Sequence, residues 1–247
     1  MCYNYEYMNT RAEKRSAREE SFSRESLTET EQQLITYHAK RLSTFNEAGS
    51  DELSNETAET ISSFPGQQTI IIPITTKQRE SYIFGFLPDW AKSLKDAKAN
   101  YNCRTETILE KPTWKNAFTR AQRCLVLAAA FYETDRATKK RYRFTVKEEP
   151  EIFFAGIFNH WADKETGELH KTFAIITCAA NDLVATVWER MPVILNYDQQ
   201  QIWMNIESAV DECNSILRSY PADAMELTEA PPLLRKKKSD PNLNLEF

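Results

Sequence analysis

The middle of the chain reads Cys124-Leu-Val-Leu-Ala-Ala-Ala-Phe131, and two further apolar runs follow it, Ile152-Phe-Phe-Ala-Gly-Ile-Phe158 and Thr172-Phe-Ala-Ile-Ile-Thr177. Each run is shorter than an average helix and rich in apolar residues, many of them β-branched or aromatic, which is typical of buried strands. Polar segments at 139–141 and 163–167 lie between the runs and predict hairpin turns. We therefore expect a β-rich core from this part of the chain.

Flanking segments add further strands and helices to this core. The predicted strands are 69–75, 82–86 and 142–146, of which the first two form a hairpin, and the predicted helices are 114–121, 198–205 and 209–218. Pro112 precedes the first of these helices, where its fixed backbone angle suits the first turn. The sequence thus predicts an α+β protein that is mostly β.

The two ends of the chain differ in composition from the core. A capping box at Thr28 and Glu31 predicts a helix over 28–43, and the polar residues 46–63 predict a loop. After Pro221 the chain is Pro-rich and then basic, which favours an exposed arm. We expect one domain over 1–220, with a polar insertion at about 9–63, and a C-terminal tail over 221–247.

Charge and composition exclude several classes of protein. The net charge of −5 argues against a protein that coats nucleic acid nonspecifically. No apolar run is long enough for a membrane span and Met1 starts no secretory signal, so we expect a cytoplasmic protein. Five cysteines without CxxC spacing predict neither a zinc site nor disulfides, and we expect no cofactor. The cations that could line a local basic cleft are Arg104, Lys111, Arg120, Arg123, Lys139, Lys140, Arg141, Arg143 and Arg190.

Cys2 follows the initiator methionine directly. Once Met1 is removed, its amine and thiol form a 1,2-aminothiol, which can close a five-membered thiazolidine on an aldehyde. The reference pKa values, about 8 for the α-amine and about 8.5 for the thiol, lie near neutral pH. No internal cysteine has this chemistry. The alternative is that Cys2 follows Met1 without functional consequence.

A series of short motifs runs through the chain in a fixed order. These motifs are Phe84-Gly-Phe-Leu-Pro-Asp-Trp90, Asn102-Cys-Arg-Thr-Glu-Thr107, Glu110-Lys-Pro112, Arg123-Cys124, Ala130-Phe-Tyr-Glu133, Phe154-Ala-Gly-Ile157, Ile175-Ile-Thr177, Ala180-Asn181 and Arg190-Met-Pro-Val-Ile-Leu195. Together with Cys2, they resemble the SRAP family, the SOS-response-associated peptidases. The match runs from Cys2 to about Asn205.

The resemblance implies both a fold and an activity. The fold is a barrel-like β core with flanking helices and a narrow basic cleft that binds DNA. The activity is covalent capture of abasic sites in single-stranded DNA, where the ring-opened sugar presents an aldehyde to Cys2. We therefore expect a monomer that has single-stranded DNA as its partner, takes part in the DNA damage response and associates with the nucleoid when bound.

The resemblance also assigns roles to individual residues. Glu133 matches the catalytic glutamate that moves protons, and Asn102 matches the active-site amide; without the family, a salt-bridged Glu and a turn-forming Asn are the alternatives. The expected DNA contacts are Arg104 and Arg190 near the phosphates, and Phe84, Pro88, Trp90 and Trp188 near the bases or sugar. For Phe84, core packing is an equal alternative.

The sequence departs from the family pattern most clearly at Trp188, which stands where the family has a histidine. Ala130 and Thr134 replace a usual Gly and Trp as well. The missing imidazole removes a group that titrates near pH 7. Two rival functions therefore stay open, a cysteine-dependent hydrolase or peptidase, as the family's name records, and a noncatalytic binder of single strands.

Overall fold

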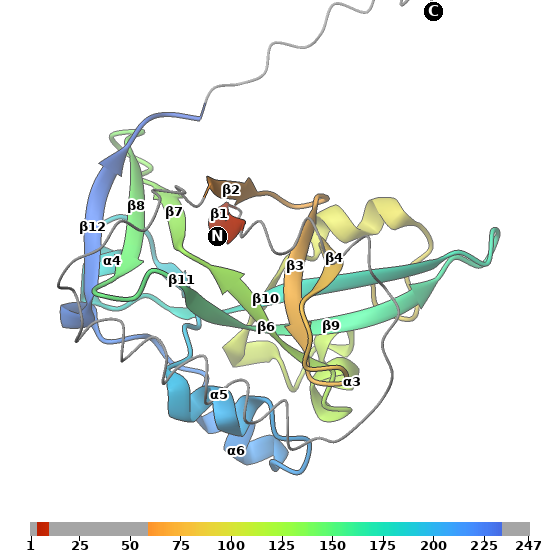
Figure 1. Ribbon diagram of the computed structural model, residues 1–247. Helices are drawn as coiled ribbons and strands as arrows, with labels where there is room; N and C mark the ends of the chain where they lie inside the picture. Colours follow the sequence, from red (N-terminus) through yellow and green to blue (C-terminus); the bar gives the residue numbers. More distant parts are fainter. Residues whose placement is uncertain (1–3, 10–58, 234–247) are drawn as a thin grey trace, which may run out of the picture.

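The computed structural model of this 247-residue chain describes residues 4–9 and 59–233 (Figure 1). The predicted helix over 28–43 lies outside the described residues, and so does Cys2. In the described part, no helix has the length and apolar character needed to cross a membrane.

Five strands close into a barrel. Its members are β3 (Gln68–Pro73), β4 (Glu80–Phe84), β6 (Arg123–Ala128), β9 (Ile152–Ala162) and β10 (Leu169–Ala179). β10 pairs with β4 in parallel, and the antiparallel pairs β4–β3, β3–β6, β6–β9 and β9–β10 complete the ring. Beyond the barrel, β9 and β10 continue as a long hairpin (Figure 1). The expected barrel-like core is confirmed.

Two short strands extend the barrel at the end of β10. β5 (Asn102–Arg104) runs parallel to β10, and β11 (Arg190–Pro192) runs antiparallel to it. Both pair with the stretch of β10 around Thr177. This end of the barrel therefore brings β5 together with the paired residues of β10 and with β11, which lie more than seventy positions later in the sequence.

A second sheet lies beside the barrel, at the left of Figure 1. Its strand order is β12 (Met225–Ala230), β8 (Arg141–Val146), β7 (Ala130–Thr134), β1 (Tyr5–Asn9) and β2 (Glu59–Ser63). Only Ala129 separates β6 from β7, so one nearly continuous strand passes from the barrel into this sheet. The Ala129 N–H donates to the carbonyl of Glu6 at 2.6 Å, which joins β1 to the crossing point.

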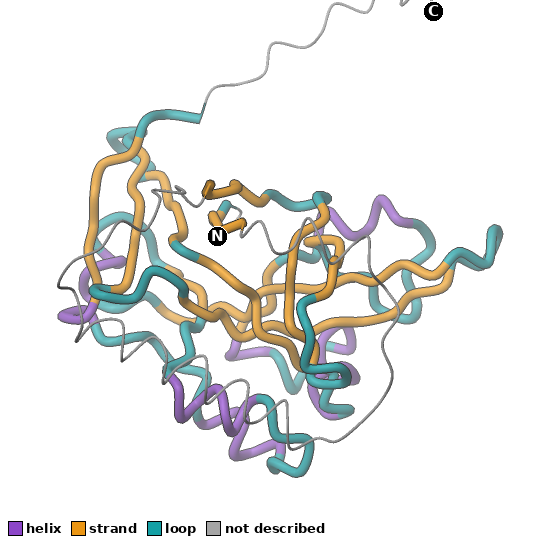
Figure 2. The backbone as a smooth tube through the Cα atoms, viewed as in Figure 1, coloured by secondary structure: helices purple, strands orange, loops and turns teal. Residues whose placement is uncertain are grey.

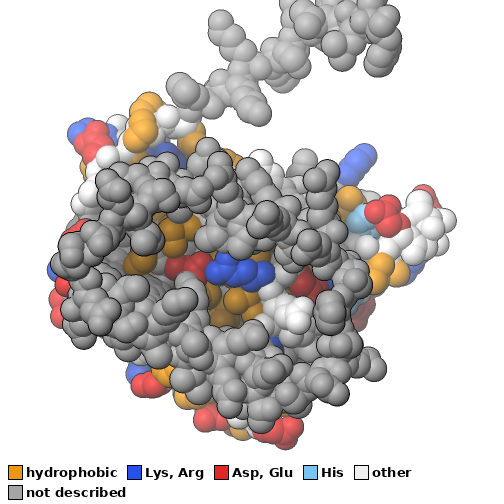
Figure 3. Space-filling view, in the orientation of Figure 1, with side chains coloured by type: hydrophobic (Ala, Val, Ile, Leu, Met, Phe, Trp, Pro, Cys, Tyr) orange, Lys and Arg blue, Asp and Glu red, His pale blue; other side chains and the backbone are white. Residues whose placement is uncertain are grey.

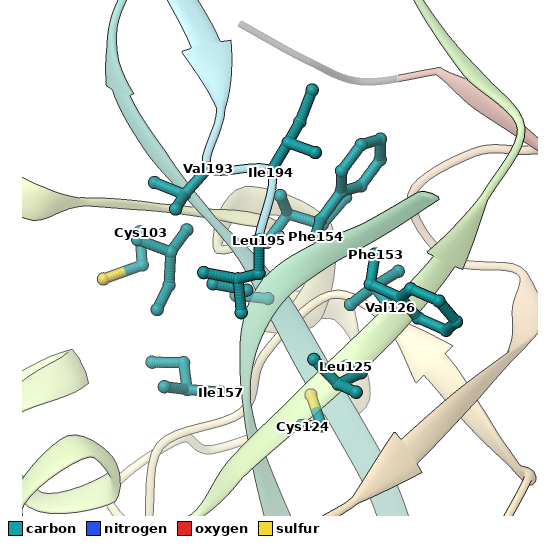
Figure 4. Packing of buried hydrophobic residues seen from close by; sticks show 14 of the residues in the cluster. Cys103, Cys124, Leu125, Val126, Phe153, Phe154, Ile157, Val193, Ile194 and Leu195 are labelled. Carbon is teal, nitrogen blue, oxygen red and sulfur yellow. The ribbon is translucent and has the colours of Figure 1, made fainter. Parts of the chain in front are cut away.

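Aromatic side chains fill the space between the two sheets. The Tyr5 ring lies edge-on to Phe84 and Phe154, with centroids 5.6 and 5.8 Å away, and Phe131 stacks on Phe144 at 4.9 Å. All five rings are fully buried. The residues after β11 pack against β9 at Phe154, where Ile194 forms a bridge (Figure 4). Burial of such large rings is the main favourable contribution to joining the sheets.

Helices cover the periphery and are short (Figure 2). They are α3 (Pro112–Thr119), α4 (Asp182–Ala185), α5 (Tyr197–Trp203) and α6 (Val210–Ser215), with 3₁₀ turns η1 (Leu94–Ala99), η2 (Thr105–Thr107) and η3 (Ala222–Ala224). Pro112 occupies the first turn of α3, as predicted. The Asn196 side chain caps α5 by accepting from the Gln199 N–H at 3.0 Å.

Two strands lie in segments that composition predicted to be a tail and a polar insertion. β12 lies inside the predicted tail, where it pairs with β8 along its whole length and buries Met225. β2 lies inside the predicted polar insertion and pairs with β1. Both are edge strands with charged or hydroxyl side chains, and such strands lack the apolar pattern of a central strand.

Candidate functional site

Glu133 is a buried carboxyl group near the end of β7. Because strand side chains alternate, Glu133 shares the face of Phe131, which packs into the core between the sheets. Its exposed fraction is 3%. Burial raises the pKa of this carboxyl to about 7. A carboxyl group with this pKa can both donate and accept a proton near neutral pH.

The first described residues of the chain lie against this strand. The Tyr132 N–H donates to the Asn4 carbonyl at 3.1 Å, and Tyr5 and Glu6 stand opposite Phe131 and Ala130. β1 therefore reaches β7 at the residue next to Glu133.

Asn102 and Arg104 lie on β5 at the end of the barrel. The strand period puts both on one face, while Cys103 between them is buried. Asn102 is half-buried, and Arg104 is exposed without an ion pair to any described residue. This pairing of a half-buried amide with an exposed cation suits a site that binds an anionic ligand.

Arg190 forms hydrogen bonds to other residues of the protein. It is 9% exposed, and its guanidinium donates to the Glu106 carboxylate and to the Thr177 carbonyl, the latter at 2.6 Å. The hydrogen bond from Arg190 holds the pKa of Glu106 below its usual range. Arg190 is therefore mostly buried and ion-paired with Glu106, and its expected place near DNA phosphates stays a prediction.

Trp188 contacts a cation that the sequence did not reveal. The Arg136 guanidinium lies over the Trp188 ring, 4.0 Å from its centroid, and also pairs with Glu189 at 3.8 Å. Arg136 belongs to the turn between β7 and β8, far from Trp188 in sequence. One face of the half-buried indole is therefore occupied by a guanidinium, a cation–π arrangement.

The segment expected to contact DNA bases divides into buried and exposed parts. Phe84 is fully buried and stacks on Phe173 at 5.2 Å, so its assignment to DNA binding is corrected to a core role. Pro88 is buried too, whereas Trp90 is 59% exposed. The surface of this segment therefore offers Trp90 for stacking.

Asn159 holds this segment against the barrel. Its side-chain amide donates to the Leu87 carbonyl at 2.8 Å and to the Asp89 carboxylate at 2.9 Å. The Trp161 indole N–H donates to the Ala91 carbonyl at 3.2 Å. Trp90 thus projects from a loop that is fixed on both sides.

Within the described part of the chain, five of the nine cations expected to line a basic cleft are buried or ion-paired. Arg123 is buried and donates to the carbonyls of Trp203 and Asn205 at the end of α5, which corrects its assignment. On the face of the molecule drawn in Figure 3, basic and acidic side chains lie next to one another at the centre. Among the described residues, the ion-paired members are Arg120 with Asp89, Lys140 with Glu229, Arg143 with Glu6, and Arg190 with Glu106.

The described residues contain no group of three or more His, Cys, Asp or Glu side chains that could hold a metal ion. The described cysteines, Cys103, Cys124, Cys178 and Cys213, are all free and buried. Burial raises the pKa of each thiol, so none of them is a thiolate nucleophile at neutral pH.

A family model described as SOS response associated peptidase (SRAP) matches residues 4–236. The chain belongs to the SRAP family. This SRAP chain is similar to the abasic site processing protein YoaM of Bacillus subtilis, with 34% identity over 161 residues that cover 64% of this chain and 70% of YoaM. The abasic site processing protein HMCES of Gallus gallus is 31% identical over 139 residues, 47% of this chain and 41% of HMCES.

Solved structures share the fold of this SRAP protein. A crystal structure of a protein from Bacteroides thetaiotaomicron superposes with a TM-score of 0.63 and 31% identity, covering 67% of this chain and 75% of that one. The resemblance read from the motifs is therefore confirmed at the level of family and fold.

Proposed function

We propose that this SRAP protein senses abasic sites in single-stranded DNA and crosslinks to them through Cys2. The observation that carries the proposal is the buried Glu133, with a pKa of about 7, beside the strand that follows Cys2. The names of YoaM and HMCES, both abasic site processing proteins, support the same substrate class.

Chain connectivity supports a meeting of Cys2 and Glu133. Two peptide units join Cys2 to Asn4, and consecutive Cα atoms are about 3.8 Å apart, so the Cys2 Cα lies within about 8 Å of the Asn4 Cα. The Asn4 carbonyl in turn accepts from Tyr132, the neighbour of Glu133. This connectivity supports the proposal that the amine and thiol of Cys2 act together with the Glu133 carboxyl group.

The proposed reaction has two stages. Ring opening of the abasic sugar exposes an aldehyde, and the Cys2 amine adds to its carbon, losing water to leave a Schiff base. The thiol then adds to the C=N carbon of the protonated Schiff base and gives up its proton, and a thiazolidine with a neutral nitrogen closes. Glu133 would supply the proton for water loss and take up the thiol proton, the work for which a pKa near 7 is suited. Neither stage consumes an oxidant or a metal.

The proposed DNA contacts are fewer than the sequence led us to expect. Arg104 would bind a phosphate, Asn102 would donate to the sugar or hold Cys2, and Trp90 would stack on a base beside the lesion. In this proposal the protein acts as a monomer and associates with the nucleoid when it is bound to DNA.

The test is to mix the purified full-length protein with a single-stranded oligonucleotide carrying one abasic site. We expect a heat-stable shifted band on a denaturing gel with the wild type, none with Cys2→Ala, and a much weaker one with Glu133→Gln. Cys213→Ala is the matched cysteine control and should crosslink normally, because that thiol is buried. If the wild type with a verified Cys2 terminus gives no band, the proposal fails.

Trp188 favours one rival, a noncatalytic binder of single strands, since the family's histidine position holds an indole stacked on Arg136. Under this rival, Cys2→Ala binds the abasic oligonucleotide as tightly as the wild type and neither crosslinks, while Trp188→His restores a titrating group and with it some crosslinking. A peptidase would instead release many product molecules per protein, whereas the crosslinker is consumed once.

A further inference from the structure

Glu6 is a buried acid on the face of the second sheet opposite Glu133. It is 7% exposed and lies on β1, four residues after Cys2. The Tyr132 hydroxyl donates to its Oε2 at 2.7 Å, and the Arg143 Nε donates to its Oε1 at 2.7 Å. A buried carboxylate that accepts from both a hydroxyl and a guanidinium has its charge compensated.

The cluster of Glu6, Tyr132 and Arg143 joins three neighbouring strands, β1, β7 and β8. Tyr132 stands directly opposite Arg143, and the Arg141 guanidinium lies over the Tyr132 ring, 3.6 Å from its centroid. Burial and the hydrogen bond to Glu6 raise the pKa of Tyr132, so the hydroxyl stays protonated and donates. We call Glu6, Tyr132 and Arg143 the strand clamp.

The pairing that the strand clamp spans is short. Within the described residues, β1 faces β7 at two residue pairs, Tyr5 with Phe131 and Glu6 with Ala130. A slip by one residue would turn Tyr5 out of the core and move every preceding residue by about 3.4 Å along the strand. Glu6 accepts from Tyr132 and Arg143 in one register, because a slip would carry its carboxylate to the other face of the sheet.

We infer that Glu6 is a positioning residue, which fixes the register of β1 against β7 through Tyr132 and Arg143 and thereby sets the distance between Cys2 and Glu133. This inference rests on the proposed function. Tyr5 holds the other face of β1, since its hydroxyl is hydrogen-bonded to Thr69 at 3.1 Å inside the core. The strand that follows the nucleophile is therefore fixed on both faces.

The first test compares Glu6→Gln with Glu151→Gln. The pairs Arg143–Glu6 and Arg79–Glu151 have nearly equal side-chain exposures, 34% and 10% against 32% and 6%, so their loss removes similar buried interactions. A displacement of about 1 Å can cost about 100-fold in rate, so we expect Glu6→Gln to slow single-turnover crosslinking by about 10- to 100-fold. Glu151→Gln should leave the rate within about threefold of the wild type. Equal rates for the two variants would overturn the inference.

A double-mutant cycle separates positioning from a general loss of structure. If Glu6 acts by bringing Cys2 to Glu133, Glu6→Gln should have little further effect in a Glu133→Gln background. Additive losses of rate would mean that Glu6 does not act through Glu133. Tyr132→Phe, which removes one hydrogen bond of the strand clamp, should give a smaller loss of the same kind and guards against poor folding of Glu6→Gln.

Amide hydrogen exchange tests the register without any activity. The amides of Ala129 and Tyr132 donate to the carbonyls of Glu6 and Asn4, so both should exchange faster in Glu6→Gln than in Glu151→Gln, while barrel amides stay protected. Unchanged protection of these two amides overturns the inference. Absence of crosslinking in the wild type would instead overturn the proposed function, and the exchange result would still decide whether Glu6 fixes the register.

Discussion

Glu133 has an ionisation that responds to pH in the range where the proposed chemistry runs. With a pKa of about 7, its carboxyl group changes from donor to acceptor across neutral pH. We expect the single-turnover crosslinking rate of the wild type to change slope near pH 7. Glu133→Gln should lose this inflection and keep only the rise from the Cys2 amine, which titrates near about 8. The same inflection in Glu133→Gln would assign it to another group.

The raised pKa of Glu133 also has a cost in stability. A carboxyl whose pKa rises from 4.5 to about 7 on folding stabilises the fold below pH 4.5 and loses that contribution as the pH rises through 7. The Glu133→Gln variant cannot ionise at this position. Its free energy of unfolding should therefore rise relative to that of the wild type by about 2–3 kcal/mol between about pH 4.5 and pH 8. Urea unfolding of both proteins at the two pH values measures the difference. A constant difference would contradict the raised pKa.

At the scale of single elements, Gly85 follows β4 directly and turns the chain into the loop that carries Trp90. Its φ is +140°, and a Cβ there would lie 2.5 Å from the Ala97 carbonyl oxygen. Gly85→Ala should therefore destabilise the protein by about 2–4 kcal/mol, because both backbone strain and a backbone clash oppose it. The midpoint of urea unfolding measures this loss.

Gly167 supplies the control for that substitution. Its φ of +74° is also positive, but a Cβ there would meet nothing within 4 Å. Gly167→Ala should cost only about 1 kcal/mol, from the backbone conformation alone. Equal losses for the two variants would mean that the close approach of Gly85 to Ala97 contributes nothing.

The sequence predicted elements where one residue pattern dominates. The sequence predicted the hairpin of β3 and β4 and the apolar strands β6, β9 and β10. It also predicted α3, with Pro112 in its first turn. β12 was not, since Met225-Glu-Leu-Thr-Glu-Ala230 precedes two prolines and buries one main anchor, Met225. The parallel pairing of β5 with β10 joins residues about seventy positions apart, and no local pattern records it.

Residue types in the site were easier to predict than their environments. The motifs indicated Glu133 and Asn102 without saying that one is buried and the other half-buried. Phe84 shows the limit, since an aromatic in a strand has the same sequence pattern whether it packs in the core or faces DNA. Arg136 and Glu6 act through partners brought close by the fold, and neither belongs to a motif.

At the scale of the whole molecule, several of the cations expected to contact DNA already have an acidic partner within the protein. The net charge is −5, and in the described part of the chain most of the cations first assigned to a basic cleft are buried or ion-paired. Those without an ion pair to a described residue include Arg104, Lys111 and Lys139. Recognition of DNA by the described part should therefore depend on a few contacts, with Arg104 at the end of the barrel foremost.

The salt dependence of binding tests this role of Arg104. Each phosphate of a single strand that a protein cation neutralises releases counterions, and this contributes about −0.7 to the slope of log affinity against log salt concentration. In a Cys2→Ala background, which keeps binding noncovalent, Arg104→Ala should reduce the magnitude of that slope by about 0.7. Lys140→Ala is the matched control, because Lys140 already pairs with Glu229 at 2.8 Å and its loss should leave the slope unchanged. Should both substitutions reduce the slope equally, the phosphates are held by diffuse positive charge, and the end of the barrel at β5 is not where the strand binds.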